Sequence, residues 1–163
     1  VSDKDRHTIV FGCDSQTSIG TQDPMLIRFS SQESLTEWGA ESINTAGDLR
    51  LGSGSEIVCA VETKQQIIVF TDTSVYAMQF LGPPFTFGIN MISDNTTISG
   101  AFAPVGIEDS VFWMGLSEFY SYDGTVKEIP CTVKDYVFKD FNQNQRSKVY
   151  AVLRGLVVLS ISQ

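Results

Sequence analysis

Short apolar runs separated by polar turns alternate along most of the chain, and one passage of this pattern occurs twice. The runs at 67–70 and 75–78 recur 44 positions later as the runs at 111–114 and 119–122, and four residues separate the two runs in both copies. A strand, a polar turn and a second strand repeated every 40 to 50 residues or so are typical of β-propeller blades. The pattern therefore predicts a repeated all-β architecture.

Each copy belongs to a longer unit of four candidate strands. The first unit has strands predicted at 56–62, 66–71, 74–81 and 86–93, and the second at 101–107, 110–115, 118–122 and 125–129. Short connections force neighbouring strands to pair antiparallel, because parallel strands need a long crossover. We therefore expect two four-stranded antiparallel meanders, in blade-like units at about 56–100 and 101–131. Asp123-Gly124 is expected to form a two-residue type I′ turn.

The rest of the chain is predicted to hold another blade-like unit, a helix and two terminal strands. Strands are expected at 8–12, 24–30 and 48–51, in a unit at about 8–55. Val133, Val137 and Phe141 lie four apart, which predicts a short amphipathic helix at 132–141 with Thr132 as its N-cap. The terminal region 147–161 is expected to form strands at 148–153 and 156–161, around the turn Arg154-Gly155.

The length of the chain limits how many blades it can hold. Its 163 residues match one domain and correspond to about 3 to 4 repeats, whereas four to eight blades close a propeller. Residues 1–163 are therefore interpreted as a single, incomplete β-propeller, and the first residue, Val1, favours a segment of a longer protein. Open blades expose strand edges and sheet faces that promote association. We expect the chain to associate with itself.

Charge and cysteine content narrow the possible partners. The net charge of −8 argues against binding many phosphates. Such acidity would let DNA slide past without specific binding, but it is also ordinary for soluble proteins. No apolar run is long enough to cross a bilayer, and we expect no membrane partner. The odd number of widely spaced cysteines (Cys13, Cys59 and Cys131) predicts buried free thiols, typical of a reducing compartment.

The sequence contains no recognisable catalytic, cofactor or metal motif. His7 is the only histidine and is expected at the surface, and the segment 52–55 lacks the lysine of a phosphate-binding loop. Five carboxylates are interpreted as turn formers rather than as the acid and base of a glycosidase: Glu62, Asp72, Asp94, Asp109 and Asp123. Asn95-Thr96-Thr97 matches the glycosylation pattern, but a three-residue match is weak. We expect a protein that is not an enzyme, with no cofactor and no metal.

Several short segments of the sequence resemble those of one family of virion proteins. They are the segments 24–30 and 44–47, the segment 71–76 followed by 80–84, and the segment 112–115 followed by 119–124. Together they resemble the packaged-DNA stabilisation, or tail hub and nozzle, proteins of short-tailed phages, over about residues 7–150. After Tyr150 the sequence departs from the family pattern.

The resemblance implies a β-propeller subunit that is made in the host cytoplasm and assembles in the virion as a ring below the portal. It implies contacts with the portal and other tail proteins, and a conduit for DNA. No functional residue is carried over, because the family acts through assembled surfaces. Two other functions stay open: a propeller that binds carbohydrate or protein and, with less support, a glycosidase-like propeller enzyme.

Overall fold

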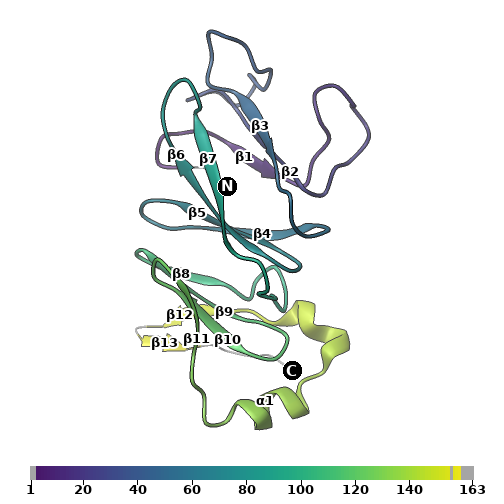
Figure 1. Cartoon of the computed structure of the whole chain (residues 1–163), viewed down its shortest axis with the longest axis vertical. Helices are drawn as coiled ribbons and strands as arrows, with labels where there is room; N and C mark the ends of the chain where they lie inside the picture. Colours follow the sequence, from purple (N-terminus) through teal and green to yellow (C-terminus); the bar gives the residue numbers. More distant parts are fainter. Residues whose placement is uncertain (1–2, 155, 159–163) are drawn as a thin grey trace.

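The computed structural model describes residues 3–154 and 156–158. This part of the chain is mostly β, with three antiparallel sheets of three or four strands, one further two-stranded sheet and few helices (Figure 1). The first sheet contains β1 (Ile9–Phe11), β2 (Leu26–Phe29) and β3 (Gly47–Arg50). The second contains β4 (Ile57–Glu62), β5 (Ile67–Thr71), β6 (Val75–Phe80) and β7 (Phe87–Ser93). The third contains β8 (Val105–Ile107), β9 (Ser110–Met114), β10 (Phe119–Tyr122) and β11 (Val126–Glu128). The sheets follow one another along the long axis, and the described residues do not close into a ring.

The repeated passage forms the same hairpin in the second and third sheets. Thr71 N–H donates to Ser74 O at 2.9 Å, and 44 positions later Gly115 N–H donates to Glu118 O at 2.8 Å. Both four-stranded sheets are meanders in sequence order. The predicted strand, turn and strand and the antiparallel pairing are therefore confirmed.

The second sheet is buried on both faces. Along β5, Ile67 and Val69 pack against the first sheet, whereas Ile68 and Phe70 pack against the third. Successive side chains of a strand point to opposite faces, so one continuous apolar run supplies two cores. Because both faces of β5 are occupied, the second sheet joins its neighbours into one stack.

The strands β4 and β8, which begin the second and third sheets, lie beside one another. Gly106 in β8 sits so close to β4 that a Cβ atom there would be 3.0 Å from Val61 Cγ1 and 3.2 Å from Glu62 O. The strand β12 lies beside β8 in turn. Phe102, just before β8, forms a parallel bridge with Tyr150, just before β12. β12 (Val152–Arg154) then pairs with β13 (Leu156–Val158). The order β4, β8, β12 therefore follows the repeat.

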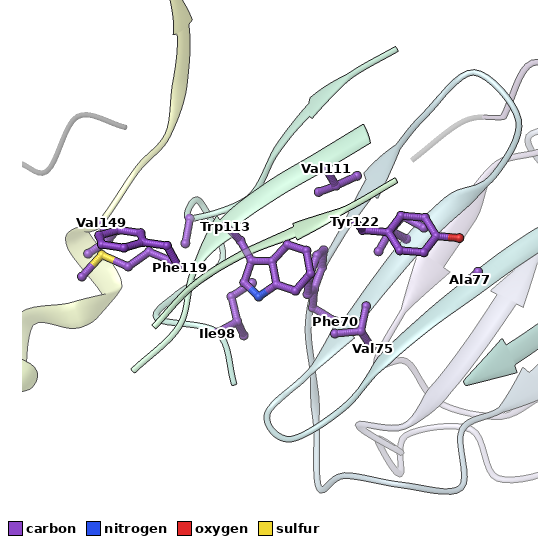
Figure 2. Packing of buried hydrophobic residues seen from close by; sticks show 12 residues of the cluster. Phe70, Val75, Ala77, Ile98, Val111, Trp113, Phe119, Tyr122 and Val149 are labelled. Atoms are coloured by element: carbon purple, nitrogen blue, oxygen red, sulfur yellow. The ribbon is translucent and has the colours of Figure 1, made fainter. Parts of the chain in front are cut away.

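The two faces of the third sheet are both covered. Figure 2 shows Trp113 beside Phe70 and Tyr122 pointing toward Ala77, while Phe119 points the other way, toward Val149. Phe119 also contacts Phe138 of α1 (Lys134–Asp140), with ring centroids 5.2 Å apart. Helical residues thus cover the face of the third sheet that does not pack against the second sheet.

The helix is present, but the prediction of its start is wrong. α1 begins at Lys134, and no side chain caps its first turn. Thr132 lies instead in a turn closed by Lys134 N–H and Cys131 O, which brings Lys134 to its ion pair with Glu118. Val133 is exposed, and the apolar side of the helix is formed by Val137, Phe138 and, just after it, Phe141.

The Asp123-Gly124 turn also differs from its prediction. Tyr122 pairs with Val126, so three residues connect the strands, and of these only Gly124 has a positive φ (109°). A type I′ turn needs positive φ at both central residues. The ion pair between Asp123 and Lys127, at 2.9 Å, accompanies the wider turn.

Two predicted strands are shorter than expected. Residues 101–104 do not join β8, because Pro104 has no N–H to donate and Ala103 N–H bonds to Gly100 O in a turn. Residues Gln143–Lys148 form a 3-10 helix, so the terminal strand begins at Val152 rather than at Lys148. Gly155 and residues 159–161 of the last predicted strand lie outside the described residues.

Gly106→Ala should destabilise the protein, because the new Cβ would press against Val61 and the backbone of Glu62. We expect the free energy of unfolding, measured by urea denaturation, to fall by about 1 to 3 kcal/mol. Gly52→Ala is the matched control, since nothing lies within 4 Å of its Cβ position. Equal stability of the two variants would contradict the close packing of β4 and β8.

Candidate functional site

The five predicted carboxylates lie at separate turns and strand ends. Asp123 pairs with Lys127 of its own hairpin, and Asp109 accepts a hydrogen bond from Gln65 at 3.5 Å. Glu62 is exposed at the end of β4, and Asp94 is exposed in the bend after β7. Within the described residues, no group of three or more His, Cys, Asp or Glu could hold a metal ion.

Asp72 fixes the connection between the first and second sheets. Its carboxylate accepts hydrogen bonds from Ser55 N–H (2.7 Å), the Ser55 hydroxyl (2.6 Å) and Glu56 N–H (3.5 Å). Burial alone would raise the pKa of Asp72, but these hydrogen bonds outweigh it and lower the pKa below its usual value. The segment 52–55, predicted to be a loop, is therefore a structural loop held onto the turn between β5 and β6.

The prediction that His7 lies at the surface is wrong, because its side chain is fully buried. Its Nδ1 lies 3.3 Å from Asp3 Oδ2, and its Nε2 lies 3.3 Å from Thr45 Oγ1. The rings of Phe80 and Phe87 pack around the imidazole. A buried polar ring is tolerated when both nitrogens have partners, so His7 anchors the segment before β1.

A polar group that sequence reasoning missed lies beside α1. Lys134 Nζ is 2.6 Å from Glu118 Oε1, in an open depression lined by these two residues and residues 128–132. The hydrogen bond to Glu118 raises the pKa of Lys134, which keeps the amine protonated. Burial, followed by the charges of Glu128 and Glu118, raises the pKa of Tyr120. A protonated lysine in an ion pair is no nucleophile, so the group stabilises the helix start.

The three cysteines are free, as predicted, but all are half-buried rather than fully buried. Cys59 lies in the first strand of the second sheet, and burial raises its pKa to about 12. Burial also raises the pKa of Cys13. Neither thiol has the low pKa of a reactive cysteine.

The remaining candidate is a surface for assembly. The first strands have no charged residue at 57–61 or at 105–107, and the charges Glu62, Lys64 and Glu108 lie at their ends. Four exposed apolar side chains lie in β12 or at the bridge that precedes β8 and β12. We call them the end patch: Phe102 (71% exposed), Tyr150 (42%), Val152 (46%) and Leu153 (53%). Contiguous exposed apolar side chains are typical of interaction sites.

Comparison with known proteins identifies no relative, since no family model matches the sequence and no curated protein matches it significantly. Among the described residues, no helix is long and apolar enough to span a membrane.

Asp72→Asn should lower stability at pH 7 by about 1 kcal/mol, because a neutral amide accepts weaker hydrogen bonds from Ser55. The folded pKa of Asp72 is below the unfolded value, so the carboxylate stabilises the protein above the unfolded pKa, about 3.9. This contribution disappears as the pH falls through the folded pKa.

Urea denaturation of both proteins between pH 7 and pH 3 measures the difference. Asp94→Asn serves as the control, since Asp94 is exposed and no hydrogen bond or ion pair of its side chain occurs within residues 3–154. A stability difference for Asp72→Asn that is independent of pH would contradict the role of the carboxylate.

Alkylation of Cys59 should be slower in the folded protein than in the unfolded protein. At pH 8 a thiol with a pKa of about 12 is ionised in about one molecule in ten thousand, so iodoacetamide should label Cys59 far more slowly in buffer than in 6 M urea or so. Peptide mass spectrometry measures the two rates. Equal rates would show that β4 does not bury this thiol.

Proposed function

We propose that the chain is a structural subunit that acts by assembly, and that its three sheets are blades of an open β-propeller. The observation that carries this proposal is the order of the first strands β4, β8 and β12, which lie beside one another and begin 48 and 47 residues apart. The burial of both faces of the second sheet also supports this proposal, because a propeller blade packs against a neighbour on each side.

We further propose that the assembly is the virion of a short-tailed phage, with the chain acting in packaged-DNA stabilisation or as part of the tail hub or nozzle. The sequence phrases described above support this family. In the virion the subunits form a ring below the portal, where they contact one another and neighbouring tail proteins. The end patch supplies an apolar surface for such contacts.

The distribution of charge suits a conduit that DNA crosses without specific binding. Two of the first strands, which face the axis of a propeller, carry no lysine or arginine at 57–61 or 105–107, and β12 carries one, Arg154. The net charge of −8 opposes retention of phosphates. We therefore propose that the functional site of the subunit is an assembled surface past which DNA moves.

A second function, a propeller that binds protein or carbohydrate through its loops, is favoured by exposed apolar loop residues. Ile19 (84% exposed) lies between β1 and β2, and Leu35 (77%) and Ile43 (88%) lie between β2 and β3. A glycosidase activity has less support, since the contacts of Asp72, Asp109 and Asp123 serve their own or adjacent turns.

Labelling of virions tests the proposed function. An antibody raised against this chain, with gold detection in the electron microscope, should label phage particles at the single tail vertex. An antibody against the major capsid protein of the same phage is the control and should label the whole head. Absence of the chain from purified particles, judged by mass spectrometry, would overturn the virion assignment.

A further inference from the structure

The turn between β10 and β11 contains Asp123-Gly124, the one place in the sequence where an Asp or Asn is followed by Gly. The antiparallel ladder ends at the pair Tyr122 and Val126, so the backbone of residues 123–125 lies outside it. All three residues of the turn are exposed, and nothing lies within 4 Å of the Cβ position of Gly124. The surroundings of this turn therefore leave Asp123 and Gly124 room to rotate.

The backbone nitrogen of Gly124 is accessible to the side chain that precedes it. Within residues 3–154 and 156–158, the Gly124 N–H has no hydrogen-bond partner. Asp123 N–H makes only a long hydrogen bond across the turn, to Thr125 O at 3.4 Å. Glycine also has no side chain that could hinder a reaction at its nitrogen. The Asp123 carboxyl group can therefore approach this nitrogen without breaking a strand pair.

The ion pair with Lys127 holds the Asp123 side chain in its charged form. Lys127 Nζ donates to Asp123 Oδ1 at 3.0 Å and to Oδ2 at 2.9 Å. These hydrogen bonds lower the pKa of Asp123, which reduces the neutral fraction of the carboxyl group at any pH above that pKa. A neutral carboxyl group can release water when a nucleophile attacks it, whereas a carboxylate resists attack. Lys127 therefore opposes a reaction between Asp123 and Gly124.

We propose that Asp123 isomerises to isoaspartate in the folded protein, and that its ion pair with Lys127 slows the reaction. The Gly124 nitrogen attacks Cγ of the neutral Asp123 carboxyl group and forms an N–Cγ bond. The proton of that nitrogen and the carboxyl hydroxyl leave as water, which gives a five-membered succinimide. Water then opens the ring: attack at Cγ restores aspartate, and attack at the main-chain carbonyl carbon leaves isoaspartate. No reactant other than water is needed.

Isoaspartate changes the end of the hairpin. The main chain then runs through the former side chain and gains a methylene group, and the free carboxylate is attached directly to Cα. This change lies next to the last pair of the ladder, Tyr122 and Val126. At the other end of the hairpin, Ile129 N–H donates to Phe119 O at 2.7 Å, away from the altered residue. The modification does not rest on the proposed function, because it needs only this turn and water.

Incubation of the full chain in buffer near neutral pH, followed by peptide mass spectrometry with electron-transfer fragmentation, tests the proposal. Isoaspartate should accumulate at residue 123 faster than at Asp109, whose following residue, Ser110, is paired in the third sheet. Lys127→Met should raise the initial rate at residue 123 several-fold, because the pKa of the carboxyl group returns toward its ordinary value. Lys127→Arg keeps the charge and should react as slowly as the wild type. Lys64→Met removes another ion-paired turn lysine and is the matched control.

A parallel incubation in guanidinium chloride gives the rate for the unfolded chain, and circular dichroism shows that each variant stays folded in buffer. Isoaspartate that forms in guanidinium chloride but not in buffer would overturn the proposal, because the folded turn would then protect Asp123. A rate for Lys127→Met equal to that of the wild type would overturn the role of the ion pair. So would a rate for Lys127→Arg as fast as that for Lys127→Met, since loss of charge would then not be the cause.

Discussion

Burial of both faces of the second sheet is the constraint on which the rest of the structure depends. Ile68 and Phe70 need the third sheet, and Ile67 and Val69 need the first, because large apolar side chains left in water cost about 1.5 to 3 kcal/mol each. The order of the sheets along the chain follows from this requirement. Trp113 completes one interface by packing edge-on against Phe70, with ring centroids 5.0 Å apart.

The turns that connect the strands are fitted to this packing. The turns of the second and third sheets meet where Lys64 N–H donates to Glu108 O at 3.1 Å, and Lys64 Nζ lies 3.2 Å from a carboxylate oxygen of Glu108. Asp72 holds the loop that enters β4, as His7 holds the segment that enters β1. Polar side chains in this protein therefore position the sheets. The candidate functional surface is formed instead by backbone groups and apolar side chains.

The sheets could be predicted from the sequence because the patterns that specify them lie within short segments of the chain. The 44-residue repeat and the short connections are visible without any contact between distant residues. The burial of His7 could not be predicted, since it depends on Thr45, Phe80 and Phe87 from other parts of the chain. The start of α1 likewise depends on Glu118, whose ion pair with Lys134 overrides the capping preference of Thr132.

The dependence of one sheet on the next also has a consequence for synthesis. Residue 113 leaves the ribosome 43 residues after Phe70, which at ordinary rates of translation takes on the order of a few seconds. Until then, Ile68, Phe70, Val75 and Ala77 form an apolar surface without its cover. The nascent chain therefore passes through an interval in which a chaperone, or the same surface of another nascent chain, can bind before the third sheet has folded over it.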